Sequence, residues 1–283
     1  MSAILEVKGL VKEYPGFRLH ELSFALEEGK ITGFIGRNGA GKTTTLHSLL
    51  GFVAPDAGEI RFWGGEFREN EQAVKQRIGF VSAGMSFYTK KKLKTITAVT
   101  RAFYPAWDEP RYRDYLRKFA LSEEKTPDAL SNGMKIKYML ALALSHGAEL
   151  LILDEPTSGL DPISREELTE IFLDLRDQGK TILFSTHITS DLDRTADNIL
   201  YIADGAIRAE DSLEGFIGAY RLAEYAERPA EAQGGELLIG ERRSRAGHTA
   251  LVRACDAGKL AIPTRAANLE EIMVHLEKEG ASC

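Results

Sequence analysis

The sequence predicts an α/β fold built on a parallel β-sheet, because short apolar runs alternate with helical patterns. Residues 31–35 form an apolar strand that enters a glycine-rich loop and then a helix. Residues 150–153 and 181–184 are typical of strands that are buried on both faces of a parallel sheet. The helical pattern between them, over about residues 165–178, completes a βαβ unit.

Further strands and a first helix are expected near the N-terminus. Residues 4–8 and 22–26 alternate between apolar and other side chains, which predicts half-buried strands. Residues 44–50 place three leucines on one helical face, and the runs 60–62 and 78–81 are further strand candidates.

Residues 83–147 are expected to form a mostly helical insert in this sheet. The amphipathic stripe near its end predicts a helix that packs one face against a core. The residues of the stripe are Ile136, Met139, Leu140, Ala143 and Leu144.

A second, smaller unit is expected at the C-terminus. The composition changes at residues 226–235, which predicts a linker between a domain at 1–225 and an α+β accessory domain at 236–283. Asn268 and Glu271 are placed as in a capping box at the start of a final helix. Strand-like runs in this domain are 237–239, 250–252 and 260–262.

The overall composition narrows the function classes. The chain has 283 residues, of which 43% are hydrophobic and 28% charged, as in soluble globular proteins. The net charge of −6 argues against broad nucleic-acid binding, which needs a basic face. Two cysteines without a CxxC spacing fit a reducing cytoplasm. A signal peptide and a membrane span are not expected, so any membrane role requires a separate spanning chain.

The strongest motif is a phosphate-binding loop that matches GxxxxGK[ST]. Its glycines let backbone N–H groups surround phosphates, and the following helix adds a partial positive charge at its N-terminus. Lys42 is expected to reach the β- and γ-phosphates, and Thr43 to offer its hydroxyl to Mg²⁺. The motif comprises Gly36, Arg37, Asn38, Gly39, Ala40, Gly41, Lys42 and Thr43.

Two further strand ends carry chemistry-bearing residues. The apolar strand at residues 150–153 ends in Asp154, a candidate Mg²⁺ ligand, and Glu155, which could orient or deprotonate the attacking water. His187 follows the strand at residues 181–184, where open α/β sheets bind ligands, and can hydrogen-bond a γ-phosphate. A lone histidine is more often structural or merely exposed.

Two aromatic residues near the second strand are candidates to stack on adenine. Tyr14 is the first candidate and Phe17 is its rival. The alternative for Tyr14 is a half-buried residue at the end of a strand, without contact to a nucleotide.

A serine and a glycine lie at a predicted helix start between the phosphate loop and the acidic pair, in the stretch Leu130-Ser131-Asn132-Gly133-Met134-Lys135. With the motifs above, in this order over about residues 4–220, the chain resembles the ATP-binding cassette (ABC) ATPases. The resemblance implies a P-loop NTPase with a RecA-like core, a helical subdomain, and a head-to-tail dimer that encloses two ATP molecules.

The resemblance also implies roles for single residues. Tyr14 is similar to the adenine-stacking aromatic, and Thr44 extends the phosphate loop. Glu155 resembles the catalytic base and His187 the switch histidine. The residues expected to act on the partner subunit's ATP are Ser131 and Gly133 of the signature and Asp161 of the D-loop.

Two departures from the family pattern bear on coupling. Asn132 stands where the signature usually has a first glycine, and Met134-Lys135 replaces the usual glutamine and its neighbour. Ala83 stands where the family usually has a glutamine that contacts Mg²⁺ and water. Either Ser82 or a water molecule is expected to take that place.

The one dense basic cluster is Lys90, Lys91, Lys92 and Lys94. It follows the Ala83 position, where the family docks its membrane subunit. Its partner could be acidic residues of that subunit or anionic lipid headgroups. The alternative is an ordinary solvated face.

The resemblance implies the ATPase subunit of a membrane transporter of the bacterial ABC-2 exporter type, with ATP and Mg²⁺ as cofactors. Its implied partners are a second ABC ATPase subunit and separate transmembrane permease subunits, and its implied place is cytoplasmic, peripheral on the inner face of the cell membrane. The cargo would be an antibiotic, a peptide or another amphipathic compound. The alternatives are an ABC-type ATPase that acts on ribosomes or nucleic acid, and a regulatory module with weak hydrolysis.

Overall fold

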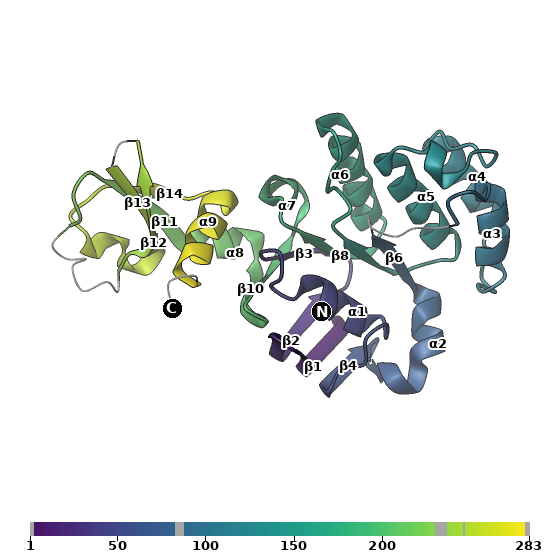
Figure 1. Cartoon of the computed structure of the whole chain (residues 1–283), viewed down its shortest axis with the longest axis horizontal. Helices are drawn as coiled ribbons and strands as arrows, with labels where there is room; N and C mark the ends of the chain where they lie inside the picture. Colours follow the sequence, from purple (N-terminus) through teal and green to yellow (C-terminus); the bar gives the residue numbers. More distant parts are fainter. Residues whose placement is uncertain (1–2, 83–87, 230–236, 246, 281–283) are drawn as a thin grey trace.

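The computed structural model describes residues 3–82, 88–229, 237–245 and 247–280. These residues form three β-sheets with helices packed around them. In Figure 1 the first two sheets and the helical segment lie together, and the C-terminal sheet forms a separate lobe at the other end of the molecule. Position 83 and most of the predicted linker lie outside the described residues.

The first sheet is antiparallel and has the strand order β2-β1-β4-β5. Its long strands bury alternate side chains such as Leu5 and Val7, as the sequence alternation predicts. The strands are β1 (Ala3–Tyr14), β2 (Phe17–Glu27), β4 (Ala57–Phe62) and β5 (Gly65–Glu66).

The second sheet positions the site and has the order β10-β9-β3-β8-β7-β6. Strands β3, β6, β7, β8 and β9 run parallel, and β10 is an antiparallel edge. Neighbouring β3, β8 and β7 therefore end side by side, and parallel sheets bind ligands at that edge. The bounds are β3 (Ile31–Ile35), β6 (Ile78–Ser82), β7 (Leu150–Asp154), β8 (Thr181–Thr186), β9 (Asn198–Ala203) and β10 (Ala206–Ser212).

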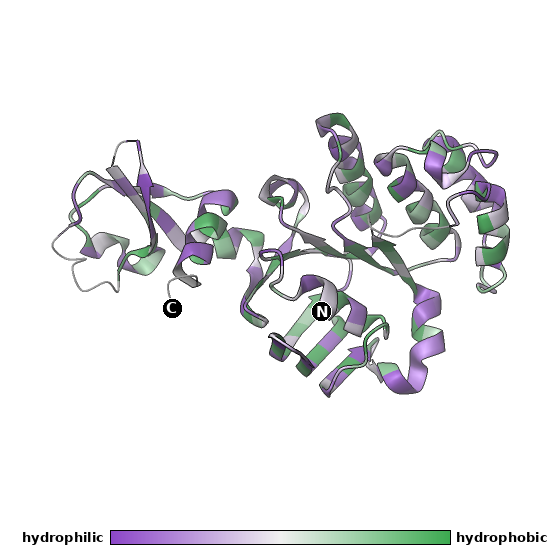
Figure 2. Ribbon diagram, viewed as in Figure 1, coloured by the Kyte–Doolittle hydropathy of each residue, from purple (hydrophilic) through white to green (hydrophobic). Residues whose placement is uncertain are grey.

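Helices flank this sheet, and the predicted strand–loop–helix and βαβ units are present. The central strands are mostly hydrophobic, whereas α2 is largely hydrophilic (Figure 2). The helices are α1 (Lys42–Leu49), α2 (Phe67–Arg77), α6 (Pro162–Asp177), α7 (Thr189–Thr195) and α8 (Leu213–Gly218).

The predicted insert is helical, with α3 (Leu93–Arg101), α4 (Glu109–Lys118) and α5 (Asn132–Ser145) and the short 3₁₀ turn Pro127–Ala129. The hydroxyl of Thr97 joins all three helices, because it lies 2.7 Å from the Tyr112 hydroxyl and 2.8 Å from the Tyr138 hydroxyl. All three side chains are buried. This shared polar contact specifies how the helices pack.

The C-terminal sheet has the order β12-β13-β11-β14. Its strand β11 precedes residue 226, so the sheet begins before the predicted domain boundary. The run 260–262 is not a strand: it lies between a 3₁₀ helix and β14, where Leu260 is buried in the small core but pairs with no strand. The bounds are β11 (Tyr220–Tyr225), β12 (Ile239–Ser244), β13 (Gly247–Arg253), the 3₁₀ helix Ala254–Lys259 and β14 (Thr264–Ala266).

Helix α9 (Leu269–Gly280) follows this sheet and reaches back to the core. The Glu271 N–H donates to Asn268 Oδ1 at 2.8 Å, and the Asn268 N–H donates to Glu271 Oε2 at 3.0 Å, which is the predicted capping box. Buried Ile272 and Met273 belong to the same hydrophobic cluster as Ile35 of β3. The C-terminal lobe is therefore anchored close to the end of β3.

Candidate functional site

The phosphate loop connects β3 to α1 and is shaped by its glycines. Gly39 and Gly41 have φ values of 85° and 114°, a region that L side chains rarely adopt. A Cβ atom on Gly36 would lie 2.2 Å from the carbonyl oxygen of Ile202, so this backbone approach also requires glycine. The nitrogen Nζ of Lys42 donates to the Gly36 carbonyl at 2.7 Å, and its side chain is only 6% exposed.

Asp154 lies at the end of β7 and contacts two hydroxyls. Thr43 Oγ1 lies 3.3 Å from Asp154 Oδ2, and Ser185 Oγ donates to Asp154 Oδ1 at 2.7 Å. Both Asp154 and Ser185 are buried. The bond from Ser185 fixes one carboxylate oxygen and leaves the other directed at Thr43. Sequence reasoning missed Ser185; its signal was a polar side chain at the end of the neighbouring strand.

Glu155 follows in the left-handed conformation, with φ of 51°. Its N–H donates to both Ser185 Oγ and the Ser185 carbonyl at 3.1 Å, which holds the turn in place. Glu155 Oε1 lies 3.5 Å from Lys42 Nζ, and His187 Nδ1 lies 2.7 Å from Oε2. Since an ionised carboxylate can only accept, the imidazole donates. The loop lysine, the acidic residue and the histidine thus form one continuous polar chain.

A cavity of about 610 Å³ opens beside these polar contacts of Lys42, Glu155 and His187. Phe17 lines it, whereas Tyr14 does not: Tyr14 is 40% exposed, and Lys12 Nζ lies 5.5 Å from the centre of its ring. Ala40 is buried beneath the loop. The other lining residues are Arg37, Asn38, Gly39, Gly41, Lys42, Thr43, Thr44, Glu155 and His187 from the predicted set, and Ser158, which sequence reasoning missed.

Ser131, Gly133 and Asp161 are not among the residues that line this cavity. Ser131 Oγ accepts from the Met134 N–H at 3.2 Å and caps α5. Asp161 caps α6 by accepting from the Ser164 N–H at 3.0 Å and the Ser164 hydroxyl at 2.6 Å, and these bonds lower its pKa. A Cβ on Gly133 would be 3.4 Å from Ser164 Cβ. The two helix starts therefore lie together, and neither contributes to the lining of the nucleotide cavity.

The residues present fit a Mg²⁺ ion bound together with a nucleotide. Mg²⁺ usually takes one or two carboxylates, with phosphates and waters completing the shell. Asp154 and Thr43 would supply the protein oxygens. Ser82 directly precedes position 83, where the family usually has its glutamine, and it is the register partner of Asp154 in the pairing of β6 with β7. Ala83 itself lies outside the described residues.

Two lysines of the basic cluster are paired. Lys92 and Lys94 each donate to Glu124 at 2.7 Å, and these bonds lower the pKa of Glu124 to about 2. Both lysines are exposed. This pairing favours the solvated-face interpretation for that half of the cluster.

Together the parallel sheet, the phosphate loop and the acidic strand end define a P-loop ATPase. Residues 19–158 match the family model described as ABC transporter. The chain is 34% identical over 214 residues to a bacitracin transport ATP-binding protein of Bacillus licheniformis. The alignment covers 74% of this chain and 70% of that protein. The chain is also 33% identical over 284 residues to a Nod factor export ATP-binding protein of Burkholderia pseudomallei, over 90% of both chains.

A solved ATP-binding subunit of an ABC transporter aligns with a TM-score of 0.68 at 28% identity, over 75% of this chain and 91% of that one. The chain therefore belongs to the ABC transporter ATP-binding proteins, and it is an ATPase of the kind that powers transport. The alternative of an ATPase acting on ribosomes or nucleic acid is not favoured, because these relatives are transporter subunits.

Proposed function

We propose that this chain is the ATPase subunit of an exporter whose membrane-spanning permease subunits are separate chains. None of the helices in the described part of the chain is long and apolar enough to cross a membrane. Separate permeases would supply the spans and hold the ATPase at the membrane's inner face. Relatives named for bacitracin transport and Nod factor export support an amphipathic cargo.

One observation carries the proposed working state. The phosphate loop, Glu155 and His187 surround one cavity, whereas Ser131, Gly133 and Asp161 are not among the residues that line it. In a head-to-tail dimer, the surface of one subunit that carries these three residues would close over the cavity of the other. Two ATP molecules would then be enclosed, each between a phosphate loop and the partner's signature.

Within the closed site each side chain has a distinct role. Glu155 orients and deprotonates the attacking water, and its contact with His187 fixes the direction of its carboxylate. Lys42 binds the β- and γ-phosphates, which replaces its contact with the Gly36 carbonyl. Mg²⁺, held by Thr43 and Asp154, would neutralise the charge that develops on the phosphates. Phe17 is placed to contact the base.

Glu155→Gln tests the assignment of the base. The variant should bind ATP, lose turnover by about 10²-fold or more, and accumulate as an ATP-bound dimer in size-exclusion chromatography. The native ATPase rate in this variant would refute the role of Glu155.

Ser131→Arg tests the trans arrangement, because the larger side chain should block dimer closure. ATP binding by the monomer should remain near native, whereas turnover and ATP-dependent dimerisation should be lost. Ser122→Arg, at an exposed serine of the same helical segment, is the control for an added arginine. An equal loss of monomer ATP affinity in Ser131→Arg would contradict action in trans.

A further inference from the structure

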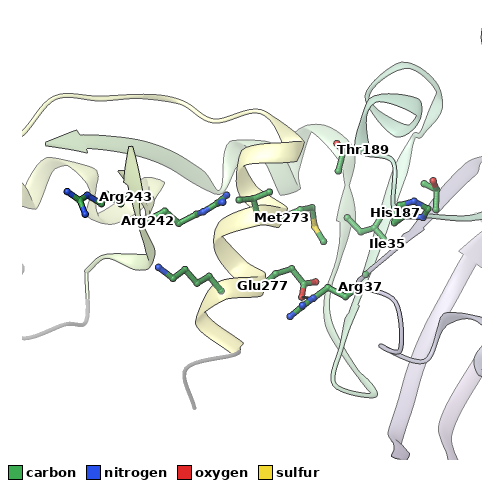
Figure 3. Close-up of a pocket in the computed structure, with 12 residues that line it drawn as sticks. Ile35, Arg37, His187, Thr189, Arg242, Arg243, Met273 and Glu277 are labelled. Carbon is green, nitrogen blue, oxygen red and sulfur yellow. Dashed lines mark ion pairs between the residues drawn. The ribbon is translucent and has the colours of Figure 1, made fainter. Parts of the chain in front are cut away.

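A second cavity lies between the C-terminal lobe and the core, beside the phosphate loop. Its volume is about 740 Å³, within the range of small-molecule sites, which often occur at domain interfaces. In Figure 3, Arg242, Met273 and Glu277 approach from the C-terminal lobe, and Ile35, Arg37 and His187 lie on the core side. Nothing in the proposed transport cycle uses this space.

The cavity has an apolar interior. Ile35 and Met273 are buried in the cluster that anchors α9 to the core, and Val274 is half-buried beside them. Thr186 and Thr189 add their short side chains from the end of β8 and the start of α7. An apolar group of a ligand would therefore be shielded from water here.

The charged groups of the cavity are mostly cationic. Four cations, Arg37, Arg242, Arg243 and Lys278, line it with a single carboxylate, Glu277. That carboxylate already has partners: it lies 3.6 Å from Arg37 Nε and accepts from the Tyr201 hydroxyl at 3.3 Å.

Arg242 and Arg243 are consecutive exposed residues of β12 that line the cavity, and their side chains leave opposite faces of the strand. In Figure 3 the Arg242 side chain is directed toward α9, whereas the Arg243 side chain is directed away from it. No carboxylate within the described ranges forms an ion pair with either of them. The guanidinium group of Arg242 is thus available to an anion in the cavity, and guanidinium binds carboxylate or phosphate oxygens in a two-pronged fashion.

We propose that this cavity is a binding site for a small amphipathic organic anion, with its apolar body against Ile35, Met273 and Val274 and its charged group at Arg242. The site adjoins the nucleotide site, because Arg37 and His187 line both cavities. An occupant would contact the residue that follows Gly36 in the phosphate loop and the histidine that orients Glu155. Bound anion and ATP should therefore alter each other's affinity by the same factor. This inference does not depend on the proposed cargo.

Decanoate, used below its micelle concentration, is a suitable probe, and isothermal titration calorimetry of the full chain measures its binding. We expect a single site that binds decanoate at least about tenfold more tightly than 1-decanol, because only decanoate offers charge-assisted hydrogen bonds. Equal affinity for decanol would overturn the assignment of the cationic end.

Variants locate the site. Arg242→Ser should weaken decanoate binding about tenfold or more, whereas Arg253→Ser, at an exposed arginine of the same lobe, should leave it unchanged. Val274→Trp should weaken binding, because the larger side chain would occupy the apolar part of the cavity beside Met273. ATP affinity, measured with a fluorescent analogue, verifies that each variant is folded. Unchanged decanoate affinity in Arg242→Ser or in Val274→Trp would overturn the proposal.

Saturating ATP separates this cavity from the nucleotide site. Decanoate should still bind when ATP is saturating, with an affinity changed by a finite factor that ATP titrations at saturating decanoate reproduce. Complete displacement of decanoate by ATP would show that the probe occupies the nucleotide cavity, and it would refute a separate site.

Discussion

The contact between Ser185 and Asp154 allows a quantitative prediction for Ser185→Ala. The hydroxyl donates 2.7 Å to a buried carboxylate and accepts the Glu155 N–H at 3.1 Å. The N–H keeps a second acceptor, the Ser185 carbonyl, so the main loss falls on the carboxylate. A hydrogen bond to a charged group contributes about 1.5–3 kcal/mol. We therefore expect unfolding to become easier by about 2 kcal/mol.

The same change should raise the Mg²⁺ concentration needed for half-maximal ATPase activity, because residues that orient a metal ligand typically affect affinity or activity by about 10–100-fold. The assay is steady-state ATPase activity titrated with Mg²⁺ at fixed ATP, with the half-saturating Mg²⁺ concentration as the readout. Ser145→Ala is the matched control, since that serine is equally buried but bonds only the Ala141 carbonyl. If Ser185→Ala kept the native Mg²⁺ requirement, Ser185 would not orient Asp154.

Three other changes probe separate features. Phe17→Ala should weaken ATP binding by about 1–3 kcal/mol, as loss of a base-stacking aromatic does elsewhere, whereas Tyr14→Ala should not; calorimetry of ATP binding that gave the reverse order would restore Tyr14. Gly36→Ala should abolish ATP binding and destabilise the fold, since its Cβ would collide with the Ile202 carbonyl, and near-native affinity would contradict that geometry. Burial lowers the pKa of His146 to about 4, so the unfolded chain binds a proton that the folded chain excludes. Stability should therefore fall as pH drops from about 6.5 toward 4, by about 2 kcal/mol at pH 5. Urea unfolding of His146→Gln should lack this part of the pH dependence.

The sequence predicted the parallel sheet, the phosphate loop and the helical insert well, because each is encoded by local patterns. Apolar runs identify buried strands, and a helix periodicity identifies α5. The contacts of α9 and β11 were not predicted. They join segments far apart in the chain, and pairing of β11 with β13 and β14 depends on which surfaces meet, which no local pattern records.

The sequence pattern does not determine which of the two aromatic candidates, Tyr14 or Phe17, faces the phosphate loop. Tyr14 and Phe17 are paired at the end of the hairpin formed by β1 and β2. Strict alternation from Val7 would assign a face to Tyr14, but the pairing shifts register between Val7 and Leu10 and again before Lys12. Each shift changes which face the following residues occupy. Only the folded hairpin shows that Phe17 faces the phosphate loop.

The positions of Ser131 and Asp161 relative to the nucleotide cavity are a second feature that the sequence does not determine. Local sequence explains why Ser131 caps α5 and Asp161 caps α6, and both bonds would form in any soluble helix with those residues. Their placement beside one another, away from the cavity, comes from packing of α5 against α6. A cap requires only the chain itself, whereas the proposed phosphate contact of this surface would be made with a second subunit. The Ser131→Arg experiment separates these two roles, because an arginine would cost the cap little beyond about 1 kcal/mol yet would exclude the partner's γ-phosphate.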